Sequence, residues 1–460
     1  MSLFSLLGNS AQSMLAHRGA SATAQNNLQN VNTPGYSRQR GNLEEASAAL
    51  LGGVRVGRGV NLTSISQARD RFIESRVSST FGGERRAAAE AEALTGVSAF
   101  DLDIPGGVAP ALRDFYSALR TLAAYPEEPG TREAVVGAAK GLQQAIGRAA
   151  TDISTARRGV DAAIPAQVAE VNELSQQVAE LNIAIRAEAG SGQAPNDLLD
   201  KRRLAADRLA ELTGASPVPD ASGDMNLLLP GGAALVVGDR TYEMSAEVDP
   251  GNGGYLALRL NGKPVDPRGL SGTLGGSLAA RDGALLRTQE GLDQFAFDFA
   301  SSLNAVNEAG FGTDGTTGKP LFLVSATATD AARQFEVNPD IEADPRGIAT
   351  SNSLDALPGN NAGVLALLAT EDAALSGGEG PAGTFATLAA AFGTDTKRAL
   401  SVAEQEGALR ARLEDLRASA SSVSIDEEMV EMMKAQRAFE ATSKVIQTVD
   451  EMLDTVMRLR

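Results

Sequence analysis

Few residues of this sequence could carry out chemistry, and their spacing matches no known catalytic or metal-binding arrangement. His17 is the single histidine and the chain has no cysteine, so any histidine-based nucleophile relay would have to use His17. A two-histidine zinc helix and a zinc–thiolate site are excluded for the same reason. Because His17 lies among small residues of a predicted helix, we interpret it as a polar position on a helix face.

The other candidate sites also lack residues that their chemistry requires. The stretch 312–320 is similar to a phosphate-binding loop because Lys319 follows a glycine, but Pro320 stands where the motif needs Ser or Thr. Asp101 and Asp103 lack the ligand spacing of a calcium loop, and no Asp/Glu pair stands out as a glycosidase dyad. We therefore expect no enzymatic activity, no cofactor and no metal site.

The strongest pattern in the chain lies at residues 424–460, which contain neither glycine nor proline. Large apolar side chains recur there every seven residues, and a second column follows three positions behind the first. The first column consists of Ile425, Met432, Phe439, Ile446 and Leu453, and the second of Ala435, Thr442, Val449 and Val456. This spacing predicts a helix of roughly 55 Å that lies against other helices.

Residues at both ends of this segment support the helix. Ser424 and Glu427 predict a capping box, and Arg458 and Arg460 place positive charge at the far end. One apolar stripe buries little area compared with the entropy of ordering so long a segment. We therefore expect the isolated helix to be frayed and to become ordered when other helices cover it.

The beginning of the chain predicts a second helix, at residues 2–30, with a weak stripe of Leu7, Met14 and Leu28. The helix stops at Asn30, and Pro34 follows shortly after. Small residues fill the rest of this segment and would allow close approach of a neighbouring helix.

A predicted turn follows this helix. Pro34 and Gly35 suit the two central positions of a type II turn, since proline fixes the first φ and glycine accepts a positive φ at the second. Tyr36 comes directly after the turn. A further stretch, 52–61, has alternating valines between glycines and predicts a short hairpin.

Composition limits the possible partners. The 58 acidic and 41 basic residues give a net charge of −17, which argues against binding to nucleic acid or to an anionic membrane. No run of 18 apolar residues occurs, so we expect no membrane span. The first 20 residues lack both a basic leader and a long apolar stretch, so we expect no cleaved secretory signal.

The middle of the chain changes character several times. Residues 66–212 predict antiparallel helices of a bundle, and 216–277 predict a small β region because short apolar runs alternate with glycine turns. A helix is predicted at 278–307, and the stretch 321–383 is mixed. Helix returns near Thr396 with apolar residues seven apart, and the serine-rich link 419–424 separates it from the C-terminal helix.

Two stretches near the ends resemble the family of flagellar rod, hook and hook-associated proteins. The N-terminal stretch is 26–39, Asn-Asn-Leu-Gln-Asn-Val-Asn-Thr-Pro-Gly-Tyr-Ser-Arg-Gln, and the C-terminal ones are 424–429 and 444–455. Two internal stretches, 196–203 and 275–282, are similar to the hook–filament junction members of this family.

This resemblance implies a structural role in bacterial motility. It implies that the terminal helices pair as an inner coiled-coil layer of the flagellar tube. The subunits would leave the cell by flagellar type III export and assemble as a ring at the hook–filament junction. Expected partners are further copies of the chain, the hook protein, the second hook-associated junction protein and an export chaperone at the C-terminal helix. Nucleic acid and membranes are not expected partners.

The resemblance, together with the two stripes, gives an expected assembly interface. It consists of Leu7, Met14, Leu28, Asn30, Pro34, Gly35, Tyr36, Ile425, Met432, Phe439, Ile446, Val449, Leu453 and Val456.

We expect an α+β fold that is elongated and multidomain. The terminal helices would pair as a coiled coil in a tube-core domain, residues 1–65 and 424–460. A helical-bundle domain would comprise 66–212 and 384–423, and an inserted β-rich outer domain 213–383, with the helix 278–307.

Two alternatives stay open at this point. The first is another axial component of the flagellum, such as the hook subunit, against which the long helical region 66–212 counts. The second is a secreted enzyme or adhesin that only uses flagellar-type ends. That alternative requires a reactive cluster or a ligand pocket within 216–383.

Overall fold

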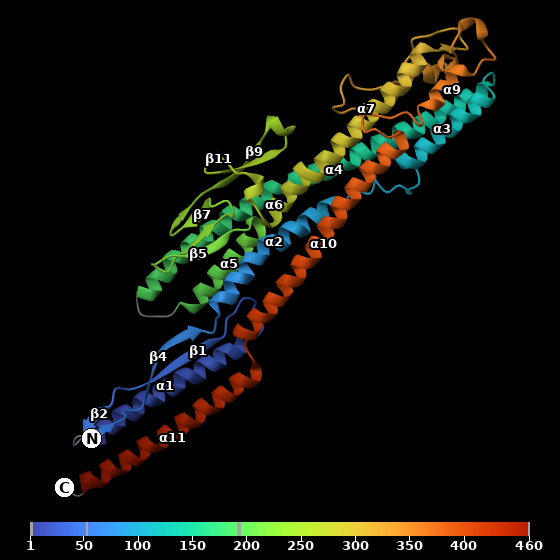
Figure 1. The fold of residues 1–460 in the computed structure, drawn as a ribbon. Helices are drawn as coiled ribbons and strands as arrows, with labels where there is room; N and C mark the ends of the chain where they lie inside the picture. Colours follow the sequence, from blue (N-terminus) through green and yellow to red (C-terminus); the bar gives the residue numbers. More distant parts are fainter. Residues whose placement is uncertain (1–2, 52–53, 191–194, 459–460) are drawn as a thin grey trace.

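The computed structural model describes residues 3–51, 54–190 and 195–458, which form a long rod (Figure 1). Both ends of the chain lie at the same end of the rod. Predictions for Gly52, for residues 191–194 and for Arg460 fall outside the described residues. None of the helices in the described part has an apolar stretch long enough to cross a membrane.

The narrow end of the rod consists of helix α1 (Leu3–Gln29) and helix α11 (Ile425–Arg458), which run antiparallel (Figure 1). Their extensive contact confirms the predicted pairing of the terminal helices. The link between the last two helices is also confirmed, because helix α10 (Pro381–Ser421) ends just before α11 begins.

The predicted hairpin at 52–61 is part of a larger arrangement of two strand pairs. The strands β2 (Ala49–Leu51) and β3 (Val54–Val56) pair there, but β1 (Gln39–Glu45) and β4 (Val60–Gln67) form a second, longer ladder. The sequence prediction missed β1 because its residues are mostly polar and exposed, without the alternation of apolar and polar residues that marks a strand. This ladder packs against α1.

The helical region predicted at 66–212 is confirmed. It consists of α2 (Arg71–Thr95), α3 (Val108–Ala124), α4 (Pro129–Gly190) and α5 (Asn196–Thr213). Helix α4 has 62 residues and continues through Pro165. It is therefore roughly 93 Å long.

Helix α10 begins at Pro381, about 15 residues before the start predicted near Thr396. The early part of α10 is rich in alanine, glycine and threonine and shows no clear stripe, so periodicity alone missed it. Pro381 is a suitable first residue of a helix, and Phe385 and Phe392 bury this part against the rest of the protein.

The predicted β region is also confirmed. A four-stranded antiparallel sheet contains β5 (Ser216–Pro219), β6 (Met225–Leu228), β7 (Ala234–Val237) and β8 (Arg240–Thr241). A three-stranded sheet contains β9 (Met244–Val248), β10 (Leu256–Leu260) and β11 (Lys263–Pro264). Both lie on one side of α4 (Figure 1).

The helix predicted at 278–307 is divided. Helix α6 (Gly272–Ala279) passes through a π turn (Ala280–Ala284) into α7 (Leu285–Ala309). Short elements follow and cover the wide end of the rod: β12 (Phe311–Gly312), β13 (Phe322–Leu323), β14 (Glu336–Val337), α8 (Pro339–Ala343), β15 (Ala349–Ser351) and α9 (Ala362–Ala369).

Two large apolar cores lie along α4. The first contains the early half of α4 with α3, α7 and parts of 321–375, and its centre is a cluster of phenylalanines that includes Phe115, Phe299 and Phe322. The second contains the later half of α4 with α5, α6 and the two sheets.

A buried arginine lies where the first core gives way to the second. Arg281 of the π turn is 1% exposed and forms ion pairs with Asp161 of α4 and with Asp282. The backbone carbonyl of Arg281 accepts a hydrogen bond of 3.1 Å from Nε of Arg157, and the guanidinium of Arg157 lies 4.4 Å from the ring centre of Tyr255. This cluster joins α4, the π turn and the loop before β10.

Candidate assembly interface

The fully buried side chains in the seam between α1 and α11 are mostly small or polar. On α11 the buried residues are Glu428, Ala435 and Val449. On α1 the buried residues are Ser13, Ala16, Thr23, Ala24 and Asn27. Since few large apolar groups are buried, the pair gains little from the hydrophobic effect within one chain.

Most of the predicted apolar interface residues are only half-buried within one chain. On α11 this class contains Met432, Phe439, Ile446 and Leu453, and on α1 it contains Leu7, Met14 and Leu28. Val449 is buried in the seam, whereas Ile425 and Val456 are each 55% exposed. The structure thus brings both stripes to the same seam but covers them incompletely.

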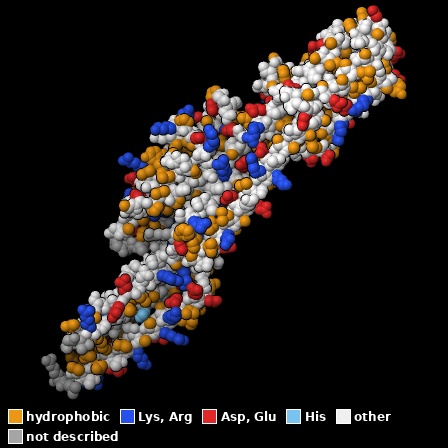
Figure 2. Space-filling view, in the orientation of Figure 1, with side chains coloured by type: hydrophobic (Ala, Val, Ile, Leu, Met, Phe, Trp, Pro, Cys, Tyr) orange, Lys and Arg blue, Asp and Glu red, His pale blue; other side chains and the backbone are white. Residues whose placement is uncertain are grey.

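Apolar side chains also lie fully on the surface of this end of the rod, as Figure 2 shows. On α1, Phe4 is 73% exposed and Leu15 is 62% exposed. On α11 the exposed apolar residues are Ile425, Met429, Val430, Met433, Val445, Met452, Val456 and Met457. Such a concentration of exposed apolar groups is typical of an interaction surface.

A buried polar network holds the start of α11 against the end of α1. Glu428 is 3% exposed, and one of its oxygens accepts a hydrogen bond of 2.9 Å from the Asn27 amide. The other oxygen accepts a hydrogen bond of 2.6 Å from Nε of Arg38. The Asn27 carbonyl in turn accepts from the Tyr36 hydroxyl, at 2.8 Å, and from the backbone N–H of Gln39, at 2.9 Å.

The acidic residues of this network stabilise the charged form of Arg38. Burial alone would lower the pKa of Arg38, but the hydrogen bonds and charges of Glu427 and Glu428 outweigh it and raise that pKa. Burial, with the nearby charges of Asp200 and Glu428, raises the pKa of Tyr36 to about 12. Tyr36 therefore stays a phenol that donates to Asn27 throughout the physiological pH range.

The type II turn after α1 is confirmed. The N–H of Tyr36 donates to the carbonyl of Thr33 at 3.2 Å, and Gly35 has a φ of 78°. A Cβ on Gly35 would lie 2.5 Å from the Leu204 side chain, so no other residue fits without a shift. Pro34 is exposed at the turn.

Other bonds tie this turn to its surroundings. Asn30 donates a side-chain hydrogen bond of 3.0 Å to the carbonyl of Asn26 at the end of α1. On the far side, the carbonyl of Gly35 accepts a hydrogen bond of 2.8 Å from Arg203 of α5.

The same turn is fixed to the helical region through Asp200. Asp200 accepts a hydrogen bond of 2.8 Å from the Ser37 hydroxyl and forms an ion pair with Arg69. Because Asp200 and Arg203 both belong to α5, the direction in which α1 leaves the helical region is set by α5.

One of the two hydrogen bonds of the predicted capping box of α11 is wrong, namely the one from the Glu427 carboxylate back to Ser424. The Glu427 N–H lies 3.5 Å from the Ser424 hydroxyl, at the limit of a hydrogen bond. The Glu427 carboxylate forms a 2.5 Å ion pair with Arg38 instead of reaching back to Ser424. The ion pair with Arg38 therefore takes the place of the bond from Glu427 to Ser424.

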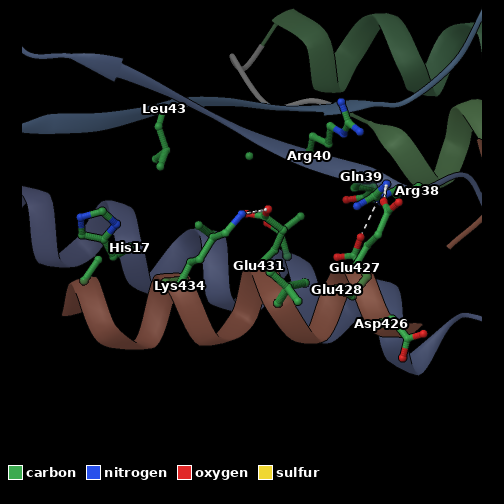
Figure 3. Close-up of a pocket in the computed structure, with 17 residues that line it drawn as sticks. His17, Arg38, Gln39, Arg40, Leu43, Asp426, Glu427, Glu428, Glu431 and Lys434 are labelled. Atoms are coloured by element: carbon green, nitrogen blue, oxygen red, sulfur yellow. Dashed lines mark hydrogen bonds and ion pairs between the residues drawn. The ribbon is translucent and has the colours of Figure 1, made fainter. Parts of the chain in front are cut away.

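A groove runs between α1, β1 and α11, with α1 as its floor (Figure 3). Its volume is about 870 Å³. One rim carries Glu427, Glu431 and Lys434 of α11, and the opposite side carries Arg38 and Arg40 of the β1 segment. His17 lines the floor.

Two further hollows continue along the same helix pair toward the chain ends. The first, of about 290 Å³, lies between Ser10, Ser13 and Val445. The second, of about 700 Å³, is lined by Leu6, Val449 and Met452 among others. No group of three or more His, Asp or Glu side chains in the described residues could hold a metal ion.

Sequence reasoning did not predict the contacts that Asn27, Arg38, Asp200 and Glu428 make with one another and with the turn after α1. A signal for one of them was present: Glu428 stands three positions after Ile425, in the register of the second apolar column. A carboxylate in an apolar column requires a buried cationic or hydrogen-bonding partner. Periodicity could not identify that partner, because Arg38 lies 390 residues away.

The Glu428 network can be tested by substitution. In Glu428→Gln the buried carboxylate that pairs with Arg38 loses its charge, so α11 should be destabilised against α1 by about 1.5–3 kcal/mol. Amide hydrogen exchange in the first turns of α11 should accelerate by roughly ten- to a hundredfold.

The matched control is Glu431→Gln on the same helix. Its ion pair with Lys434 is exposed, with side chains 55% and 66% accessible, and should contribute at most about 1 kcal/mol. Equal exchange in the two variants would show that the buried network does not hold the helix pair.

Comparisons with known proteins agree with this architecture. The family described as "Flagellar hook-associated protein FlgK helical domain" matches residues 103–322, and "Flagellar basal body rod FlgEFG protein C-terminal" matches 417–459. Flagellar hook-associated protein 1 of Escherichia coli (strain K12) is 24% identical, over 99% of this chain and all of the relative. That of Bacillus subtilis (strain 168) is 25% identical, over 99% of this chain and 98% of the relative.

Two other similarities cover less. Flagellar hook-associated protein 1 of Salmonella typhimurium is 28% identical over 330 residues, which span 70% of this chain but only 60% of that relative. The solved structure of the flagellar hook junction protein FlgK from Burkholderia pseudomallei has a TM-score of 0.67 and 17% identity. It covers 76% of this chain and all of that chain, and so shows a shared fold.

Proposed function

We propose that the chain is a structural protein, not an enzyme, and that it joins the flagellar hook to the filament. This proposal is supported by the match to the FlgK helical domain and by the similarity to flagellar hook-associated protein 1 over nearly the whole chain. It acts outside the cell as a structural adaptor, and copies of it assemble into a ring through their terminal helices. Its neighbours in the assembly are the hook protein and the second hook-associated junction protein. An export chaperone binds α11 before secretion.

The observation that carries this proposal is the incomplete burial of α1 and α11. The helices pair through small residues and one polar network, while apolar residues along both remain half-buried or exposed. A stripe with this exposure is stabilised when further helices cover it. The predicted interface residues, from Leu7 to Tyr36 and from Ile425 to Val456, are the proposed contacts.

The three-part division expected from the sequence is part of the proposal. The tube-core part, 1–65 and 424–460, is supported by the α1–α11 pair. The small sheets on one side of α4 support an outward-facing part within 213–383. The segment beyond α7 shares the first apolar core with α3 and α4, and so adds to the helical part.

The test is electron microscopy of cells of the source bacterium that lack this chain. We expect hooks without filaments, and monomeric flagellin in the culture medium, with both defects reversed by the complete chain on a plasmid. Normal filaments in the cells without the chain would refute the junction role.

A further inference from the structure

We propose that α1 binds a second copy of the chain by inserting Phe4 and Leu15 into the hollows between α1 and α11 of that copy. This inference rests on the proposed function, because it specifies the self-contact through which the ring would form.

The inserted residues lie on a face of α1 that is exposed in the part of the chain that the structure describes. Phe4 and Leu15 are among the most exposed large apolar residues, at 73% and 62%. They are 11 residues apart, which is about three helical turns, so they point in nearly the same direction. The buried residues of α1, such as Ser13 and Ala24, lie on the opposite side. Between the two large side chains this face carries only small groups, such as Gly8 and Ala11.

The receiving hollows have the same spacing as the inserted residues. On α1 the 290 Å³ hollow spans residues 6–13 and the 870 Å³ groove spans 17–24. The two sets are therefore offset by 11 residues, or roughly 16 Å along the helix. Small side chains of α11 line both hollows, namely Ala435 and Ala438 in the groove and Ala441 in the smaller hollow. Large side chains can enter both.

Charge fixes the direction of the contact. Arg18 is the only Lys, Arg, Asp or Glu between Leu3 and Gln29 and, among the described residues, forms no ion pair. It lies one turn beyond Leu15. If the two α1 helices run parallel, with Leu15 in the groove, Arg18 comes level with Glu427 and Glu431, which line the same groove. Their side chains are 62% and 55% accessible, so each carboxylate can take Arg18 as a further partner beside its own Arg38 or Lys434.

The contact is heterologous. The inserting face and the receiving groove are different surfaces of one chain, so each copy can use both at once and the contact can repeat from copy to copy. The parallel arrangement staggers neighbouring α1 helices by five or six residues, or about 8 Å.

Cysteine cross-linking tests this contact directly, because the natural chain has no cysteine. The full-length double variant Leu15→Cys with Ala438→Cys is expressed in cells that lack the natural chain, and the isolated flagella are mildly oxidised. We expect a ladder of disulfide-linked multimers on a non-reducing gel. Leu15 faces away from its own α11, so a link within one chain does not compete.

The matched control pairs Leu15→Cys with Met433→Cys. Met433 is 44% exposed, but it lies on the other flank of α11, about 140° around the helix from Ala438. We expect no ladder from this control. A second pair, Phe4→Cys with Val445→Cys, tests the smaller hollow and should give the same ladder as the first.

Three results would overturn the inference while the proposed function stands. These are equal ladders from test and control, no ladder although the chain is present at the hook, and a cross-link of Leu15 to a different flagellar protein. By contrast, complete absence of the unmodified chain from isolated flagella would refute the proposed function, and the inference with it.

Discussion

Removal of residues 424–460 should abolish filament attachment while leaving the rest of the chain folded. The reason is that the apolar cores and α11 are separate: no described residue of α11 belongs to any of the cores along α2, α4 and α7. The truncated protein should therefore keep its unfolding transition. Because α1 and Arg38 lose their partner helix, it should not assemble.

This prediction is measured by electron microscopy, swimming assays and thermal unfolding of the purified truncated chain. Export must be checked separately, since the proposed chaperone site lies in the deleted helix. The full-length variant Val449→Asp serves this purpose, because it keeps the helix but places an unpaired charge at a seam position that is 2% exposed.

Val449→Asp should reach the culture medium and still fail to attach filaments. Normal swimming of cells that carry either variant would show that the terminal pair is not the assembly interface.

Replacement of Arg281 by methionine should destabilise the central part of the rod by about 3–5 kcal/mol. Among the described residues, Arg281 is the largest fully buried side chain, and the substitution removes its ion pairs with Asp161 and Asp282. Burial would raise the pKa of Asp282, but hydrogen bonds from Arg281 and Asn252 outweigh it and hold that pKa below its usual range. The Asp282 carboxylate is thus stabilised in its charged form by Arg281.

The measurement is guanidinium unfolding followed by far-ultraviolet circular dichroism. Arg268→Met is the control, because Arg268 has a 92% accessible side chain and pairs only weakly with Asp266, at 3.5 Å. This control should change stability by at most about 0.5 kcal/mol. If both variants unfold at the same denaturant concentration, the cluster at the border of the two cores does not contribute to stability.

Features that depend on neighbouring residues could be predicted from the sequence. The helix of α11 follows from a glycine- and proline-free heptad pattern, and the turn at Pro34 and Gly35 follows from the φ preferences of those two residues. The helical region, the β region and the serine-rich link follow from periodicity and turn residues for the same reason.

Features that depend on distant residues could not be predicted in this way. The partner of Glu428 is Arg38, and the turn after α1 is fixed by Asp200 and Arg203 of α5. The early start of α10 depends on burial of Phe385 in a core built from other helices. Strand β1 has no pattern of its own and exists because β4 pairs with it.

The sequence by itself determined that there is one long helix near its beginning and one near its end, each with an apolar stripe. These features follow from periodicity, which is a local property of the chain. Only the tertiary structure decided which side of each helix is covered, which buried charges meet in the seam and where exposed residues and hollows repeat at the same spacing. These depend on contacts between residues hundreds of positions apart, whose geometry is set by the packing of the whole rod.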